Sequence, residues 1–512
     1  MKSLLLVIDI GTTSVKAVLF TTTGTLVRSS TAAYRTQYPQ SGWAQQDPEN
    51  YWKATVEAVS TLVNAGVDAT AIEAIGLSGH MNGCLLVDSS GKPTYPHIIH
   101  ADSRSSRQCS HIDEIWGQKQ IYERTGNRID EHLSLPKLLW IQENRPEAVS
   151  SSAYFINAKD YIRFKLTGIL GTTDFSDSSL TGIFNPVGRT WDYEIADSLG
   201  LQRNIFCDVH TSTEVAGPLV GEVARLLGLR EGIPISYGGG DAACATRGAG
   251  VSTPGQGYAA LGSSAWVSTL AQQPQFDDKM RMQHFLDLEG ELCNVCGTVQ
   301  SASIALDWIR HLLKRHGSGR EDLNVIEGRL EKLPVGSSGV LFLPYLMGER
   351  TPHWDARARG AYIGLSLSTD TDTLIRATYE GVAYALADCM DVYDDLALPI
   401  RQFTLLGGAA RSTFWQRMIA EVLGRQVSIH PYPSQATALG AAYAAGVSVG
   451  MWKDIGEAIA VSAERQDTQA EIVIPDRQRS DLYRQIHAIY RQLYPAMDAI
   501  HRQLERIRDT HV

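Results

Sequence analysis

Residues 4–16 read LLLVIDIGTTSVK, and this stretch decides the fold. The unbroken aliphatic run Leu4–Ile8 predicts a buried strand, and the small polar residues Gly11–Thr13 predict a turn. Val15–Phe20 then predicts a second strand that returns beside the first. The chain therefore opens with a hairpin whose first strand ends at an acidic residue, Asp9.

That acid and the turn after it are the first candidates for chemistry. A carboxylate at a strand end can hold Mg²⁺, usually through waters. The backbone N–H groups of Gly11, Thr12 and Thr13 can cradle a phosphate, and Lys16 on the returning strand adds positive charge. The alternative is a plain hairpin in which Asp9 only caps the turn.

A second passage has the same layout. Gly257–Leu261 and Ala265–Leu270 predict two strands, and the small residues Gly262, Ser263 and Ser264 between them form a second candidate phosphate turn. Two such units indicate that the chain consists of two related halves. Its 512 residues suit two domains, which we predict as 1–248 and 249–512.

Two further glycine-rich turns are also candidate functional sites. In Gly238–Gly240 the backbone can come close to a ligand, and Asp241 follows directly, where a carboxylate could take a proton from a hydroxyl group. A glycine turn with a helix-capping aspartate is the alternative. In the second turn, Gly407, Gly408 and Ala409 follow a strand and could offer flat backbone to a purine. Neither a GxGxxG nor a GxxxxGK[ST] motif is present there.

The overall composition limits the classes of protein to which this chain can belong. Net charge is 46 − 56 = −10, so a nucleic-acid partner held by a basic face is not expected. No apolar run approaches the roughly 20 residues that span a bilayer, and the start lacks a cleavable signal, so we expect a cytoplasmic protein. Strands alternate with helices predicted at 47–63, 372–396 and 413–423 and with an Ala-rich helix starting near Gly440, which favours an α/β architecture. The tail, 477–508, predicts one polar, exposed helix.

With these motifs in order, the chain resembles the FGGY family of carbohydrate kinases. Lys137–Asn144 is similar to the family's first signature, and Phe342–Pro352 with Arg359-Gly360 is similar to the signature of its C-terminal domain. The resemblance implies two ribonuclease-H-like domains of the actin, Hsp70 and hexokinase ATPase type, with ATP and sugar in an active-site cleft between them. It also implies ATP and Mg²⁺ as cofactors.

The same resemblance implies roles for the matching positions. Asp241 would be the catalytic base and Asp9 the metal-linked acid. The two phosphate loops and the adenosine turn would comprise Thr12 and Thr13, then Gly262 and Ser263, then Gly407, Gly408 and Ala409.

Within the family, Gly76–Gly83 is most similar to the xylulokinase segment GLSGQMHG, and Ala101–Arg104 and Thr173–Asp177 also resemble xylulokinase stretches. The implied substrate-binding residues are His80, Met81, Asn82, Asp102 and His132, with Asp241 beside them. This chain departs from the pattern, since His80 replaces Gln, Asn82 replaces His, and His100-Ala101 replaces Trp-Asn.

The hypothesis is therefore ATP-dependent phosphorylation of a small sugar, with D-xylulose as the first candidate acceptor. Another ketose, a polyol or gluconate remains open. An alternative of another class is a regulatory ATPase on the same fold that phosphorylates no small molecule. A small-molecule sugar is the expected partner, without nucleic acid or membrane, and a homodimer is the candidate assembly.

Overall fold

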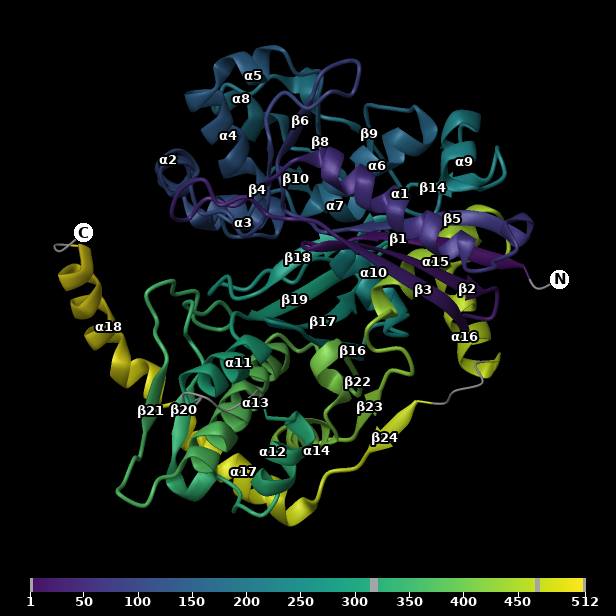
Figure 1. Ribbon diagram of the computed structural model, residues 1–512. Helices are drawn as coiled ribbons and strands as arrows, with labels where there is room; N and C mark the ends of the chain where they lie inside the picture. Colours follow the sequence, from purple (N-terminus) through teal and green to yellow (C-terminus); the bar gives the residue numbers. More distant parts are fainter. Residues whose placement is uncertain (1–2, 314–320, 466–469, 510–512) are drawn as a thin grey trace. The chain divides into compact units, whose positions relative to one another are not determined.

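The computed structural model describes residues 3–313, 321–465 and 470–509 (Figure 1). The chain forms two compact units, neither of them continuous in sequence. The first unit comprises Met1–Thr253, Leu270–Val295 and Gln435–Gln469, and the second comprises Pro254–Thr269, Cys296–Ser434 and Ala470–Val512. The functional division at 1–248 and 249–512 stays a prediction.

The first unit is built on a seven-stranded sheet. Its spatial order is β13 (Val215–Pro218), β14 (Pro234–Ser236), β5 (Ile72–Gly79), β1 (Leu4–Ile10), β2 (Ser14–Thr21) and β3 (Leu26–Ala33), with β15 (Gly239–Gly240) also paired to β5. β1, β2 and β3 are antiparallel neighbours, whereas β5 runs parallel to β1. The predicted opening hairpin is confirmed.

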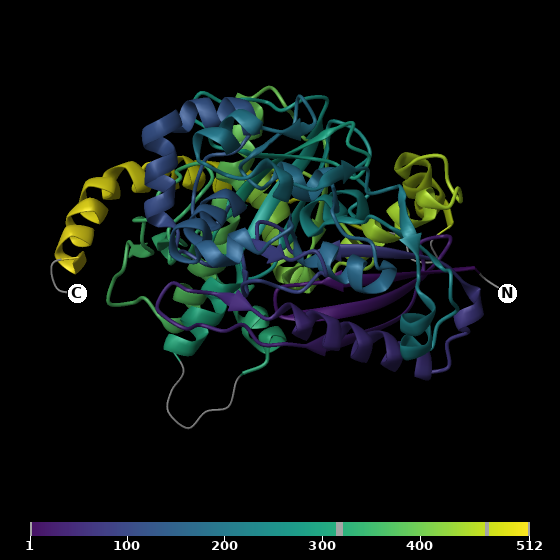
Figure 2. The same ribbon diagram turned by 90° about the horizontal axis from the view of Figure 1, so that it is seen from above.

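Helices cover both faces of this sheet. The helices of the unit are α1 (Pro48–Asn64), α2 (Ser106–Trp116), α3 (Gln118–Thr125), α4 (Ser134–Asn144), α5 (Pro146–Ser150), α6 (Ala158–Thr167), α7 (Phe175–Ser179), α8 (Tyr193–Ser198), α9 (Gly221–Leu227), α10 (Asp241–Gly248), α15 (Ala436–Ser448) and α16 (Ile455–Arg465). α1 lies along β2 and β3 (Figures 1 and 2), and its core includes Leu4, Leu6 and Ile8 of β1. Because strand side chains alternate, Asp9 faces the opposite side, where Gly76 of β5 packs on Ala441 of α15.

The second sheet repeats the strand order of the first. It runs β18 (Gln283–Leu286), β19 (Cys293–Val299), β17 (Ala265–Ala271), β16 (Gln256–Leu261), β22 (Gln402–Leu406), β23 (Val427–Ile429) and β24 (Glu471–Val473). β16 pairs antiparallel with β17 and parallel with β22, as β1 does with β2 and β5. The predicted relation between the two halves is therefore confirmed by topology.

Short pairs and further helices complete the fold. The two-stranded pairs are β4 (Gln45–Gln46) with β7 (His97–Ile98), β6 (Leu85–Val87) with β8 (Tyr154–Ile156), β9 (Thr172–Asp174) with β12 (Asp208–His210), β10 (Phe184–Asn185) with β11 (Thr190–Trp191), and β20 (Leu341–Leu343) with β21 (Ala361–Ile363). The helices of the second unit are α11 (Ser303–Leu312), α12 (Leu323–Leu330), α13 (Thr371–Asp395), α14 (Thr413–Leu423), α17 (Arg477–Tyr490) and α18 (Leu493–Asp509). Among the described residues, none of the helices combines the length and apolarity needed to cross a bilayer.

The predicted tail helix is wrong in two respects. The segment forms two helices, α17 and α18, rather than one. Moreover, Tyr483 and Tyr490 of α17 are buried, and the Tyr483 hydroxyl donates to Glu380 of α13 at 3.0 Å. The two tyrosines are seven residues apart and so share one helix face, which binds the tail to α13 despite its polar composition. The Ala-rich helix α15 also begins before Gly440, at Ala436.

A glycine crossing fixes α10 against α15. A Cβ atom on Gly440 would lie 1.9 Å from the carbonyl oxygen of Cys244, and one on Gly248 would lie 1.8 Å from that of Ala436. Both obstacles are backbone, which cannot rotate away. α10, whose first residue is Asp241, is thus held at van der Waals distance from α15.

We expect Gly440→Ala to lower the free energy of unfolding by roughly 1–3 kcal/mol, because the helices must separate. Gly328→Ala in α12 is the matched control, since a Cβ there meets nothing within 4 Å. Removing a helix-interior glycine should stabilise that control by up to about 1 kcal/mol. Thermal and urea denaturation measure both, and equal effects of the two changes would contradict the packing argument.

Candidate active site

Three strand ends meet on one side of the first sheet. Asp9 of β1 lies opposite Lys16 of β2 and opposite Ser78 of β5, and Ser78 in turn lies opposite Gly239 of β15. β15 leads directly into Asp241. The sheet therefore brings the two predicted functional carboxylates, Asp9 and Asp241, together at the ends of neighbouring strands, although they are far apart in sequence.

The two carboxylates influence each other's charge. Asp241, at the first turn of α10, is half-buried. The pKa of Asp241 is raised to about 7. The larger cause is its removal from water and the smaller is the negative charge of Asp9, while Lys16 acts in the opposite direction. Burial also raises the pKa of Asp9, and again Lys16 opposes the shift. A carboxylate with a pKa near neutrality is suited to accept a proton from an alcohol.

The carbonyl groups of the turn Gly11–Thr13 are held by the protein. The Gly11 N–H, one of the three predicted phosphate donors, is already occupied, because it donates to the Ser14 carbonyl at 3.0 Å. The Tyr34 hydroxyl donates to the Gly11 carbonyl, Gln46 Nε2 donates to the Thr12 carbonyl at 2.7 Å, and the Tyr34 N–H donates to the Thr13 carbonyl at 3.0 Å. Because a trans peptide directs its N–H opposite to its carbonyl, the next N–H groups along the turn point outward. Phosphate binding by this turn stays a prediction, and it would use the N–H groups that follow Gly11 and Thr12.

The loop after β5 touches the glycine turn. A Cβ atom on Gly240 would lie 2.4 Å from the Met81 sulfur, so Met81 packs directly on the residue before Asp241. Asn82 follows in the left-handed region with φ of 65°, and its side chain is buried. Within the described residues, Asn82 Oδ1 has no hydrogen-bond partner. A buried unpaired acceptor in a strained backbone position is typical of a ligand site.

His80 belongs to a buried aromatic cluster. Its ring stacks on His97 at 5.3 Å and meets the ring of Tyr51 edge-on at 5.8 Å. Burial, with the nearby His97, keeps the pKa of His80 well below its usual value, and burial lowers the pKa of His97 to about 3. Both rings are therefore neutral at physiological pH. In the part of the chain that the structure covers, neither nitrogen of His80 has a hydrogen-bond partner.

This cluster is linked to the phosphate turn. The Tyr51 hydroxyl donates to Gln46 Oε1, so its oxygen accepts from His97 Nδ1–H at 2.8 Å. Gln46 in turn holds the Thr12 carbonyl. His97 of β7 is thus connected to the turn by three consecutive hydrogen bonds, and His80 joins this chain through the stacking of its ring on His97.

The carboxylate of Asp102 is occupied by its own loop. Asp102 is buried and forms an ion pair with Arg104 at 2.7 Å, and it also accepts from the Ala44 N–H. The guanidinium of Arg104 lies over the ring of Trp43, 3.8 Å from its centroid. His132 lies beside Asp130, with 3.5 Å between Nδ1 and Oδ2. The substrate contacts of Asp102 and His132 stay predictions.

In the second unit, the second candidate phosphate turn, Gly262–Ser264, lies beside the candidate adenosine turn, Gly407–Ala409. The Gly262 carbonyl accepts from the Ser303 N–H at 3.0 Å, and the Ser263 carbonyl accepts from the Ala302 N–H at 2.8 Å, which directs the following N–H groups outward. Ser264 closes this turn by accepting from the Gly262 N–H. A Cβ atom on Gly407 would lie 2.4 Å from the Leu261 carbonyl oxygen, so the Gly407–Ala409 turn lies directly beside the Gly262–Ser264 turn. Gly408 faces open space.

Sequence reasoning missed several residues that shape this site. Tyr34, Gln46 and His97 act through contacts between distant segments and carry no local motif. A buried group around Lys159 and Asp174 was also missed, although the pair of acids in Thr173–Asp177 after a strand was a usable signal. The cysteines are free and, apart from the half-buried Cys109, buried.

Each of the two seven-stranded sheets contains an antiparallel hairpin whose first strand is followed by a turn and pairs in parallel with a later strand. Two sheets of this kind define the ribonuclease-H-like class of ATPases. Models of the N-terminal and C-terminal domains of the FGGY family of carbohydrate kinases match residues 4–248 and 257–449. The chain therefore belongs to the FGGY family of carbohydrate kinases. It is a sugar kinase that uses ATP and acts on a small-molecule sugar.

Individual relatives agree with this assignment. The chain is 30% identical over 487 residues to a xylulose kinase from Escherichia coli, covering 95% of this chain and 98% of that one. It is 31% identical over 454 residues to a gluconokinase from Bacillus subtilis, covering 86% of each. A ligand-bound xylulose kinase structure from Lactobacillus acidophilus superposes with a TM-score of 0.89 at 25% identity, covering 98% of this chain and 100% of that one.

Proposed function

We propose that this protein transfers the γ-phosphate of Mg-ATP to the C5 hydroxyl of D-xylulose, with Asp241 as the base. The observation that carries the proposal is Asp241 itself, a half-buried carboxylate at the start of α10 whose pKa is raised to about 7. A base of this strength accepts the hydroxyl proton as the oxygen attacks the γ-phosphorus. The proton moves to a carboxylate oxygen of Asp241, and ADP leaves with the bridging oxygen.

The outward N–H groups of both turns support phosphate binding in this proposal. Those after Gly11 and Thr12 and those after Gly262 and Ser263 would stabilise negative charge on the transferred group. The turn Gly407–Ala409, beside the second of these, would receive the adenosine. Enclosing substrate and nucleotide would also keep out water, which competes as an acceptor.

The residues fit a magnesium ion. Asp9 and Asp241 are neighbouring carboxylates whose negative charges oppose each other, and hard oxygen donors are the ligands that Mg²⁺ prefers. Asp9 would hold the hydrated ion. When bound, Mg²⁺ supplies positive charge to the β- and γ-phosphates.

The choice of an uncharged sugar rests on the loop after β5. The unpaired nitrogens of His80 and the unpaired Oδ1 of Asn82 can hydrogen-bond to hydroxyl and keto groups. Both side chains are neutral, since the pKa of His80 lies well below its usual value. They therefore offer no positive charge to a carboxylate. Gluconate is the second candidate, because a gluconokinase is among the relatives.

The test is an ADP-release assay on the full-length protein with D-xylulose, other ketoses, polyols and gluconate, each with and without Mg²⁺. We expect the highest kcat/KM with D-xylulose and none without a divalent ion. Preference for gluconate would assign the second candidate. ATP hydrolysis that no sugar stimulates would instead support the regulatory ATPase. The cytoplasmic location and the homodimer stay predictions.

A further inference from the structure

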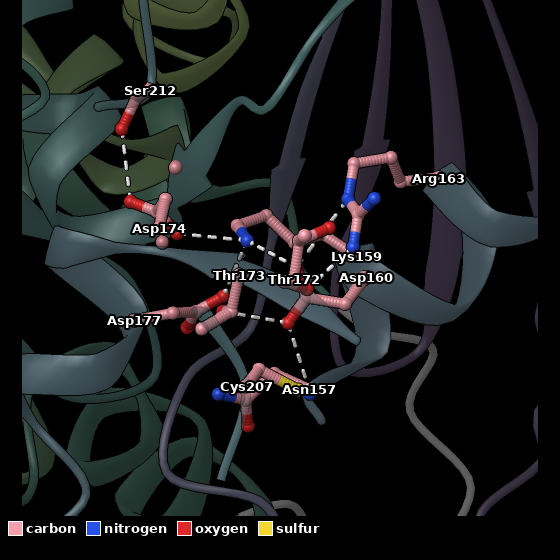
Figure 3. A network of polar contacts seen from close by, with 12 residues as sticks. Asn157, Lys159, Asp160, Arg163, Thr172, Thr173, Asp174, Asp177, Cys207 and Ser212 are labelled. Carbon is pink, nitrogen blue, oxygen red and sulfur yellow. Dashed lines mark hydrogen bonds and ion pairs between the residues drawn. The ribbon is translucent and has the colours of Figure 1, made fainter. Parts of the chain in front are cut away.

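Lys159 of α6 is fully buried among three carboxylates (Figure 3). Its Nζ atom lies 2.7 Å from Asp160 Oδ1, 2.8 Å from Asp174 Oδ1 and 3.1 Å from Asp177 Oδ2. Removing so many charges from water is costly unless they compensate one another. A group of this kind, close to a candidate active site, therefore needs an explanation.

Cations and carboxylates alternate in this group. Lys159 and Arg163 are the cations, and Arg163 Nε lies 3.8 Å from Asp160 Oδ1. Burial raises the pKa of Asp177 well above its usual value, which reduces the negative charge that the two cations must compensate. The close contacts of Lys159 with all three acids hold these side chains in fixed positions.

The second carboxylate oxygen of Asp174 accepts hydrogen bonds from two serines. Asp174 Oδ2 accepts from the Ser176 N–H at 2.9 Å, from the Ser176 hydroxyl, and from the Ser212 hydroxyl at 2.9 Å. All three side chains are fully buried. Lys159 thus fixes Asp174, and Asp174 fixes the orientation of both serine hydroxyls.

The two serines in turn hold the glycine turn before the base. The Gly240 N–H donates to Ser176 Oγ at 2.9 Å, and the Gly238 N–H donates to the Ser212 carbonyl at 3.2 Å. A Cβ atom on Gly239, between them, would lie 3.1 Å from Ser176 Oγ. The turn is therefore held at both ends, by Ser176 and by Ser212.

We propose that Ser176, oriented by Asp174 and Lys159, is a positioning residue that places the Asp241 carboxylate for proton transfer. Ser176 uses its single proton on Asp174, so its lone pair is directed at the Gly240 N–H. Asp241 is the next residue, and α10 begins there. Releasing this hydrogen bond lets the Asp241 carboxylate move while His80 and Asn82, in the loop after β5, stay in place. The inference rests on the proposed function.

The test is Ser176→Ala in the full-length protein, assayed with the best substrate of the sugar panel. We expect kcat to fall about tenfold or more, because small displacements of a catalytic group are costly. KM for the sugar and for ATP should stay within about twofold, and sugar binding measured calorimetrically should be unchanged, since proximity and not affinity is lost.

Ser178→Ala is the matched control. Ser178 is equally buried on α7, and its hydroxyl donates to the Asp174 backbone carbonyl at 2.8 Å without touching the glycine turn. It should lose similar stability and keep kcat. If Ser176→Ala and Ser178→Ala give the same kcat, the positioning role is wrong. A rise of KM in parallel with the fall of kcat in Ser176→Ala would also overturn it.

Ser176→Cys covers the case in which the alanine variant does not fold. Cysteine is close to serine in size, and its thiol is only a weak acceptor, so kcat should fall in the same direction but less. An unchanged kcat in Ser176→Cys would count against the inference. Wild-type protein that phosphorylates no sugar would refute the proposed function instead, so the two failures are distinguishable.

Discussion

Asp241→Asn is expected to lower kcat by roughly 10²- to 10⁴-fold, the usual contribution of a general base. The amide keeps the size of the carboxylate but cannot accept the hydroxyl proton. Sugar KM should change little, because the polar atoms of His80 and Asn82 remain available. Steady-state ADP release with the best sugar measures both constants. Asp88→Asn, a half-buried acid in a turn of the same unit, is the control and should keep full activity.

The pH dependence gives this prediction a second readout. A base must be unprotonated, so wild-type kcat should fall as the pH drops through about 7, the raised pKa of Asp241. The residual activity of Asp241→Asn should lack this acidic limb. A wild-type limb near the unperturbed value of 3.8 would be incompatible with Asp241 as the titrating base.

Stability should move in the opposite direction to activity. Because the folded pKa of Asp241 is raised above its unfolded value, ionising this acid destabilises the fold, and stability is lost as the pH rises through the interval from 3.8 to about 7. Asp241→Asn should therefore have a higher Tm than wild type at pH 8, and the difference should disappear near pH 4. A variant that loses activity and Tm together would point to a folding defect.

The sequence predicts those parts of the site that consist of residues close together along the chain. The strand Leu4–Ile10, its acid and the small-residue turn are contiguous, so hydrophobic pattern and turn chemistry suffice to identify them. The same holds for the Gly262–Ser264 turn, whose similarity to the first turn predicts the repeated topology that both sheets have.

The remainder depends on contacts between distant segments. Pairing of Gly239 and Gly240 with the end of β5 places Asp241 near Asp9, and nothing in the glycine turn specifies that partner. In the sequence, Lys159 looks like an ordinary surface lysine on a polar helix. It is nevertheless fully buried, because Asp160 of its own helix and two acids from a later segment, Asp174 and Asp177, surround it. Burial of this kind is a property of the assembled unit.

Asp9→Asn should reduce kcat/KM for ATP by roughly 10- to 100-fold, the cost that is usual for a residue holding a metal through its outer shell. The concentration of Mg²⁺ needed for half-maximal rate should rise, because the amide lacks the negative charge that holds the hydrated ion. Titrating Mg²⁺ at fixed ATP in the ADP-release assay measures this change. Glu73→Gln, an exposed acid on β5 of the same sheet, serves as the control.

The decisive feature of this variant is its effect on the other carboxylate. The charge of Asp9 is the second largest cause of the raised pKa of Asp241, so removing it should lower that pKa. The acidic limb of the residual activity should therefore shift to lower pH in Asp9→Asn, while Glu73→Gln leaves it in place. An unmoved limb would mean that the two carboxylates act independently, and the pairing of β1, β5 and β15 would then not explain the base. A shift of the acidic limb would instead show that the pairing of these strands, by placing Asp9 near Asp241, sets the pKa of the base.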